Sequence, residues 1–115
     1  MSTRVAPIFP VSNLVAALAY YHGLGFGVRH WHSGGYGFVT FDGAEIHLGV
    51  EPDLDTRVDR RSTAYLFVED ADALYAEYAA QGVDFTRGVT NMPWHSREFV
   101  VKDCDGRLLA FGANL

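Results

Sequence analysis

The chain has 115 residues, of which 49% are hydrophobic and 20% charged, and its formal net charge is −5. This composition excludes a disordered chain, and the acidic balance argues against a nucleic-acid binder, which needs a basic face. No apolar run approaches the roughly 20 residues of a transmembrane helix, and the first residues lack a signal-peptide layout. We therefore expect a single domain over residues 1–115 in the cytoplasm, with neither a nucleic-acid nor a membrane partner.

The first half of the chain predicts a strand, a helix and three further strands. Residues 5–11 are apolar but contain two prolines, which predicts an edge or exchanged strand because proline cannot donate to a strand ladder. Ser12 or Asn13 is a candidate N-cap of a helix that ends near Gly23 or Gly25. Glycine-containing turns then separate expected strands at residues 26–32, 36–41 and 44–50.

The same order of elements returns after a polar connection at residues 51–62. We expect a strand at 64–68, a helix with Asp70 as its N-cap, a short strand at 83–87, a longer loop at 88–95, and strands at 96–102 and 107–113. The two matching orders of elements indicate an internal repeat of about 60 residues. Its halves are residues 5–50 and 63–113. The predicted fold class is α+β, with two βαβββ repeats that form curled mixed sheets and leave a concave binding face.

Three motifs in the second half carry a resemblance to a known family. They are ALYAEY at residues 73–78, PWHSREF at 93–99 and KDCDG at 102–106. With the βαβββ repeats, they resemble the bleomycin-resistance branch of the glyoxalase, or vicinal-oxygen-chelate, superfamily. That resemblance implies a homodimer with an exchanged N-terminal strand and two ligand grooves at the subunit boundary.

The enzymes of this superfamily hold a metal ion on four inward strand positions, which correspond here to Ala6, His47, Thr63 and Ala110. Alanine cannot ligate and threonine is a poor ligand, so one histidine is left. We expect no metal site, no cofactor and no catalytic residues. His47 is instead expected to be a hydrogen-bonded residue of the concave face, because its neighbours alternate toward the helix.

Aromatic residues make up 14% of the chain, and flat rings on a rigid sheet suit a planar ligand. The alternative is that these rings fill a dimer core. The resemblance assigns ligand contact to four of them, and strand alternation adds a phenylalanine and the histidine. The candidate ligand-binding residues are Tyr36, Phe38, His47, Tyr65, Phe67 and Trp94. The stretch 31–35 lacks the acidic residues that the drug binders of the family carry there.

We therefore predict a protein that binds and sequesters a planar small molecule, with cationic bleomycin-type antibiotics among the candidates. Two alternatives stay open. One is a metal-dependent enzyme of the superfamily (a lyase, dioxygenase or thiol transferase), and the other is a structural or regulatory dimer with an unused concave face. Cys104 lies between Asp103 and Asp105, whose charges disfavour a thiolate, so we do not expect it to be a nucleophile.

Overall fold

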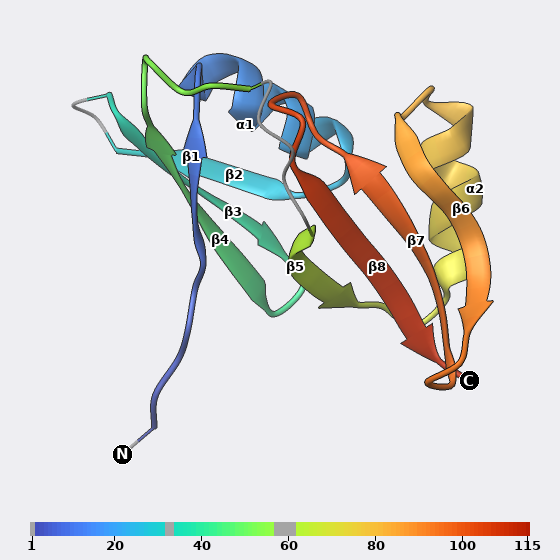
Figure 1. Cartoon of the computed structure of the whole chain (residues 1–115). Helices are drawn as coiled ribbons and strands as arrows, with labels where there is room; N and C mark the ends of the chain where they lie inside the picture. The colour runs from blue at the N-terminus through green and yellow to red at the C-terminus, as the bar shows by residue number, and fades with distance from the viewer. Residues whose placement is uncertain (1, 32–33, 57–61) are drawn as a thin grey trace. The chain divides into compact units, whose positions relative to one another are not determined.

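The computed structural model describes residues 2–31, 34–56 and 62–115. The chain divides into two units, residues 1–56 (unit 1) and 57–115 (unit 2), and each contains one helix and one four-stranded sheet (Figure 1). The predicted halves, 5–50 and 63–113, fall within these units. The α+β class and the repeated βαβββ order are therefore confirmed.

Unit 1 has the sheet order β1-β4-β3-β2, in which β1 is parallel to β4 and the other pairs are antiparallel. Among the described strands β1 pairs with β4 alone, so the predicted edge position of the proline-bearing strand is confirmed. The expected strands at 5–11 and 26–32 are shorter in the structure, and His32 lies outside the described residues. The elements are β1 (Ile8–Val11), α1 (Leu14–Gly23), β2 (Gly27–His30), β3 (Tyr36–Phe41) and β4 (Ala44–Val50).

Helix α1 begins at a side-chain cap. The Asn13 Oδ1 atom accepts a hydrogen bond from the backbone N–H of Ala16 at 2.9 Å, which satisfies one of the donors that a helix N-terminus leaves unpaired. The helix covers one face of its sheet closely, since a Cβ atom at Gly37 would lie 3.1 Å from Leu14 and 3.2 Å from Leu18. The absence of a side chain at Gly37 thus lets α1 approach β3.

Unit 2 has the equivalent sheet order β5-β8-β7-β6. The Asp70 Oδ1 atom caps its helix by accepting the N–H of Ala73 at 3.0 Å, as the sequence predicts. Tyr78, Phe99 and Phe111 are buried between the helix and the sheet. The elements are β5 (Ser62–Phe67), α2 (Ala71–Ala80), β6 (Phe85–Met92), β7 (Ser96–Lys102) and β8 (Leu108–Asn114).

Strand β6 is longer than predicted. The expected short strand at 83–87 and long loop at 88–95 are wrong, because the strand continues to Met92 and a tight turn follows it. The pairing of β6 with β7 shifts register twice, on either side of Arg87. Such shifts interrupt the two-residue alternation by which a strand is recognised in a sequence.

The turn between β7 and β8 is held by a buried aspartate. The Asp103 Oδ1 atom accepts the backbone N–H groups of Asp105 and Arg107, each at 2.9 Å, and Oδ2 accepts the Arg107 Nη1 at 3.2 Å. Gly106 has φ +81°, a left-handed conformation that favours glycine. The predicted Asp-Gly turn at 105–106 is therefore confirmed.

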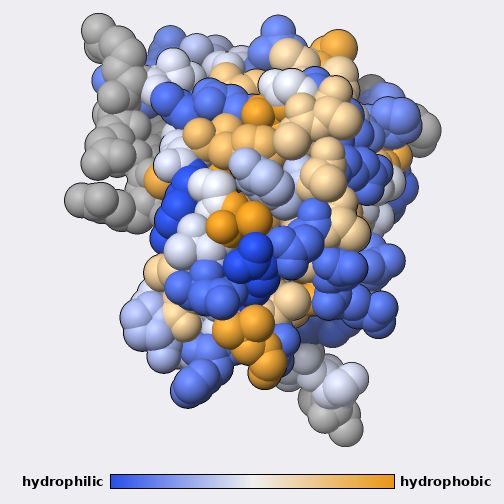
Figure 2. Space-filling model, turned by 90° about the vertical axis from the view of Figure 1, so that its right-hand side faces the viewer, coloured by the Kyte–Doolittle hydropathy of each residue, from blue (hydrophilic) through white to orange (hydrophobic). Residues whose placement is uncertain are grey.

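Neither of the two described helices has the length and apolar character that crossing a membrane requires. Figure 2 views the side that carries α2 and β6, where hydrophilic side chains predominate and apolar ones are scattered between them.

Candidate ligand-binding site

The sheet of unit 2 presents two chemically different faces. On β7, Phe99 faces α2, and its ring centroid lies 6.0 Å from that of Tyr78. Because successive strand residues point to opposite faces, Glu98 and Val100 lie on the other side of the sheet. A cavity of about 450 Å³ lies on that other side. Its walls are Ala64, Tyr65, Arg87, Trp94, Glu98, Val100 and Ala110.

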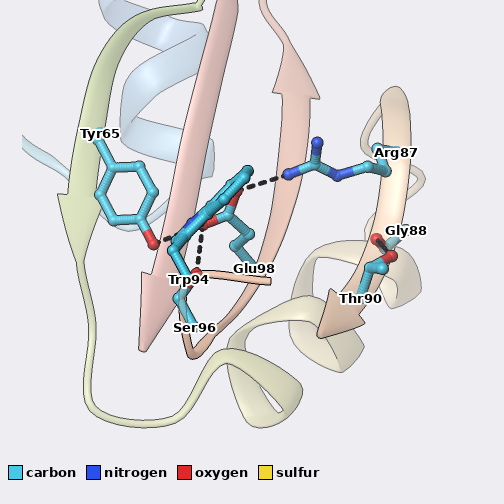
Figure 3. A network of polar contacts seen from close by, with 7 residues as sticks. All are labelled: Tyr65, Arg87, Gly88, Thr90, Trp94, Ser96 and Glu98. Carbon is cyan, nitrogen blue, oxygen red and sulfur yellow. Dashed lines mark hydrogen bonds and ion pairs between the residues drawn. The ribbon is translucent and has the colours of Figure 1, made fainter. Parts of the chain in front are cut away.

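The carboxylate of Glu98 is the centre of a polar network in this cavity (Figure 3). Its Oε2 atom accepts the hydroxyl of Tyr65 at 2.7 Å, the hydroxyl of Ser96 at 2.8 Å and the indole Nε1–H of Trp94 at 3.4 Å. Its Oε1 atom accepts the Nη2 group of Arg87 at 2.7 Å. Four donors from three strands and a turn therefore converge on one buried carboxylate.

These contacts decide the charge states in the cavity. Burial alone would raise the pKa of Glu98, but the hydrogen bonds from Tyr65, Ser96, Trp94 and Arg87 outweigh it and hold the pKa below the ordinary 4.5. Burial, followed by the hydrogen bond to Glu98, raises the pKa of Tyr65 above its ordinary 10.0. At neutral pH the glutamate is thus ionised and the tyrosine is a hydrogen-bond donor.

Gly112 on β8 makes room for the ring of Tyr65. A Cβ atom at position 112 would collide with the Tyr65 hydroxyl and would lie 3.0 Å from the Cβ of Glu98. The position of Tyr65 in the cavity therefore depends on a residue without a side chain.

Unit 1 carries a second polar and aromatic cluster on the equivalent strands. The Tyr36 hydroxyl and the His47 Nδ1 atom are 2.9 Å apart, and the His47 Nε2 atom lies 2.8 Å from the Glu45 Oε2. The Arg29 guanidinium lies 4.3 Å from the centroid of the Phe38 ring. The hydrogen bond from His47 is the main cause that lowers the pKa of Glu45. A Tyr–His–Glu chain and a cation–π pair thus share one face of this sheet.

The strand phase proposed for His47 is confirmed. Ile46 and Leu48, its neighbours in β4, are buried on the helix side, whereas His47 is only half-buried. His47 makes hydrogen bonds through both ring nitrogens, as expected for a hydrogen-bonded residue of that face.

The six predicted site residues fall into two groups. Tyr36, Phe38 and His47 lie together on unit 1, with ring centroids 4.8 to 5.5 Å apart. Tyr65 and Trp94 line the cavity of unit 2. Phe67 is 77% exposed, and its ring lies 4.9 Å from that of Tyr65 but does not line the cavity.

Trp94 lies in a tight turn and not in the predicted long loop. The turn spans Pro93 to His95, and it closes with a hydrogen bond of 3.1 Å from the His95 N–H to the Met92 carbonyl. His95 adopts a φ of 63° there. The Trp94 side chain is 61% exposed and contacts the cavity through its indole N–H, so it is a rim residue and not a core residue.

Sequence reasoning missed Arg87, Ser96 and Glu98 as site residues. Ser96 and Glu98 lie two residues apart in β7, just before the apolar run Phe99-Val100-Val101, and this spacing could have indicated a polar pair on one face of the strand. No comparable signal exists for Arg87, because its direction depends on the irregular register of β6.

The residues at the metal positions of the superfamily do not fit a metal ion. Ala6 and Ala110 have no ligating side-chain atoms, and both ring nitrogens of His47 are already hydrogen-bonded. The side chain of Thr63 lies outside the described part of the chain. Within that part, no three His, Cys, Asp or Glu side chains are grouped so that they could hold a metal.

Comparison with solved structures gives the same fold several times. A bleomycin resistance determinant encoded on the transposon Tn5 is 21% identical with a TM-score of 0.85, covering 98% of each chain. A bleomycin-binding protein complexed with bleomycin is 21% identical with a TM-score of 0.84, covering 99% of this chain and 100% of that one. A glyoxalase-related enzyme from Clostridium phytofermentans is 18% identical with a TM-score of 0.82, covering 100% and 97%.

No curated protein sequence matches the chain. The family model described as Glyoxalase/Bleomycin resistance protein/Dioxygenase superfamily matches residues 4–111, which is nearly the whole sequence. The protein therefore belongs to the glyoxalase/bleomycin resistance protein/dioxygenase superfamily.

Proposed function

We propose that the protein binds and sequesters a planar small molecule without converting it, and that bleomycin-type antibiotics are the first candidates. The observation that carries this proposal is the cavity of unit 2, where the Tyr65 ring and the Trp94 indole flank a buried carboxylate. The names of two solved structures that share the fold, a bleomycin resistance determinant and a bleomycin-binding protein, support the choice of ligand.

The size of the cavity suits a planar small molecule or one planar group of a larger ligand. Its volume of about 450 Å³ is within the roughly 300–1,000 Å³ range of small-molecule sites. The hydroxyl of Tyr65 and the indole N–H of Trp94 both donate to the carboxylate of Glu98. These hydrogen bonds orient both side chains before a ligand binds. Holding the rings in advance reduces the entropy lost on binding. The exposed ring of Trp94 can also receive a cationic group of the ligand.

The chemistry of the cavity supports binding more than catalysis. A general acid or base works best with a pKa near the operating pH, whereas the hydrogen bonds to Glu98 hold its pKa below 4.5. Tyr65 has a pKa above 10.0 and stays protonated. Neither group is suited to proton transfer at neutral pH.

The proposal includes a homodimer that exchanges its N-terminal segment. The carbonyl of Pro7 still accepts the backbone N–H of His47 at 2.9 Å, but the residues before it lead away from the sheet of unit 1 (Figure 1), and Val5 is 89% exposed. Ile8, the first residue of the edge strand β1, is 62% exposed, although β1 itself pairs with β4 of the same chain. Apolar side chains beside an open sheet edge favour cover by a second copy.

Tryptophan fluorescence tests the binding function directly. The chain contains two tryptophans, Trp31 and Trp94, so Trp31→Phe leaves Trp94 as the only reporter. This variant is titrated with bleomycin and with a panel of glycopeptide and aromatic antibiotics, and each ligand is recovered and weighed by mass spectrometry. We expect a saturable change in fluorescence and an unchanged ligand mass. The absence of saturable binding would refute sequestration, and a changed mass would favour the enzyme alternative.

A further inference from the structure

We propose that Arg87 is the specificity-determining residue of the unit 2 cavity. It selects planar ligands that carry an acceptor oxygen, a carboxylate or a carbonyl, next to the ring. This inference rests on the proposed function. It adds the chemical class of the ligand group that would bind beside Arg87 and Glu98.

The first observation is that the backbone of β6 turns Arg87 into the cavity. Phe85 pairs with Val101 and lies on the α2 side, where its ring centroid is 4.6 Å from that of Tyr75. In a regular strand Arg87 would lie on that same side. It pairs instead with Val100, a cavity residue, because the register shifts between Phe85 and Arg87. A bulge has thus redirected this side chain, as bulges beside functional sites do.

A second register shift follows immediately, between Arg87 and Thr90. In this irregular segment, the Thr90 hydroxyl donates a hydrogen bond to the Gly88 carbonyl at 2.8 Å (Figure 3). A Cβ atom at Gly88 would lie 3.3 Å from the hydroxyl of Tyr75, so position 88 returns to the α2 side. Register shifts on both sides of Arg87 therefore set its direction, which is a local property of the backbone.

The second observation concerns which polar groups in the cavity still have hydrogen-bonding capacity. The Glu98 carboxylate already accepts four hydrogen bonds, and three of them go to Oε2. The Arg87 guanidinium has five N–H groups but makes only the one Nη2 hydrogen bond to a described residue. Its Nε is buried without any partner among those residues. The unused capacity next to Tyr65 and Trp94 is thus that of a donor, which calls for an acceptor on the ligand.

The third observation concerns charge. Glu98 is ionised but forms an ion pair of 2.7 Å with Arg87, so the two charges offset each other inside the cavity. A cationic ligand group would have to displace the guanidinium from this pair, and it would leave Arg87 unpaired. A carboxylate can instead bind the guanidinium fork through two parallel hydrogen bonds, and a carbonyl can accept one. Competition at Glu98 therefore selects against a cation at this wall.

Three probes with one ring and different substituents test the assignment: 2-naphthoate, 2-naphthamide and 2-naphthylmethylammonium. Their dissociation constants are measured by isothermal titration calorimetry at pH 7 on the full chain. We expect 2-naphthoate to bind most tightly, 2-naphthamide next and the ammonium probe least. Arg87→Met is expected to weaken 2-naphthoate binding by about tenfold or more, the scale of a charged hydrogen bond. It should leave the ammonium probe unaffected or tighter.

Two variants separate specificity from folding. Arg87→Lys keeps the charge but loses the fork, so it should recover part of the 2-naphthoate affinity. Arg97→Met removes an arginine that pairs with Asp72 outside the cavity, and it should change no affinity. If Arg87→Met fails to fold, the double variant Arg87→Met/Glu98→Gln removes the unpaired buried charge, and the same loss of preference for 2-naphthoate is expected.

The outcomes distinguish the two proposals. Tightest binding of the ammonium probe, or 2-naphthoate affinity that does not depend on Arg87, overturns the assignment of Arg87 while the binding function stands. If neither these probes nor bleomycin binds to the wild-type chain, the proposed function itself fails.

Discussion

The hydroxyl of Tyr65 occupies the space above Gly112 that a side chain at position 112 would fill. The two residues are on neighbouring parallel strands, β5 and β8. Because the glycine leaves this space open, Tyr65 can reach the carboxylate of Glu98 at 2.7 Å and form a wall of the cavity. One missing Cβ atom thus contributes to both the packing and the binding surface of unit 2.

Gly112→Ala should therefore displace the Tyr65 ring and break its hydrogen bond to Glu98. Overpacking of this kind costs about 1–3 kcal/mol of stability, and ligand affinity should fall as well. Chemical denaturation and fluorescence titration measure the two effects. Gly43→Ala is the matched control, since no atom lies within 4 Å of a Cβ at that position. Equal stability and affinity for the two variants would contradict the proposed role of Gly112.

Glu98→Gln should change the pH dependence of stability. The native pKa of Glu98 lies below its ordinary 4.5, so its ionised form stabilises the fold above pH 4.5. This contribution is lost as the pH falls through the lowered native value. We expect the difference in unfolding free energy between wild type and variant to shrink from pH 7 to pH 3. The exposed Glu77→Gln serves as control, and a difference that stays constant with pH would contradict the account.

Trp94→Ala should weaken ligand binding more than it weakens folding. The side chain is exposed at the cavity rim, so its removal opens no core cavity. Loss of a stacked aromatic ring costs roughly 1–3 kcal/mol of binding free energy. Phe111→Ala, in the buried core, should cost about 3–5 kcal/mol of stability. Thermal melting and ligand titration on the same samples compare them, and unchanged affinity with a collapsed melting temperature for Trp94→Ala would disprove the rim assignment.

Val5→Asp should convert the proposed homodimer into a folded monomer. Val5 is exposed in the single chain, so a charge there harms only a contact with a second copy. Deletion of residues 1–11 should instead unfold unit 1, because Phe9 and Val11 are buried in its core. Analytical ultracentrifugation measures the oligomeric state, with the exposed Val15→Asp as control. A wild-type chain that is monomeric at micromolar concentration would refute the dimer.

Cys104 should react slowly with alkylating reagents. Although residue Cys104 is exposed, partial desolvation of its thiol, and then the charges of Asp103 and Asp105, raise the pKa of the thiol to about 11. Only the thiolate is nucleophilic, so the rate with iodoacetamide at pH 8 should be far below that of glutathione and should keep rising up to about pH 11. A fast reaction at neutral pH would show that the thiol is not in this environment.

Much of the fold follows from local sequence signals. The Asn13 and Asp70 side chains cap their helices, and the Asp-Gly turn at 105–106 has the left-handed glycine that such a turn favours. His47 and the buried Leu48 are neighbours in β4, and strand alternation places their side chains on opposite faces of the sheet. These signals are reliable because each depends on backbone geometry within a few residues.

The candidate site depends on contacts between strands that are distant in sequence. Glu98 receives donors from β5, β6, β7 and the turn at 93–95, and its partner Tyr65 lies 33 residues away. The family resemblance predicted Tyr65 and Trp94 as ligand contacts, but it did not predict the carboxylate that accepts hydrogen bonds from both. The direction of Arg87 is set by the register of β6 against β7, which only the paired strands decide. Hydrogen bonding across the sheet, and not residue type, determines which face such a side chain takes.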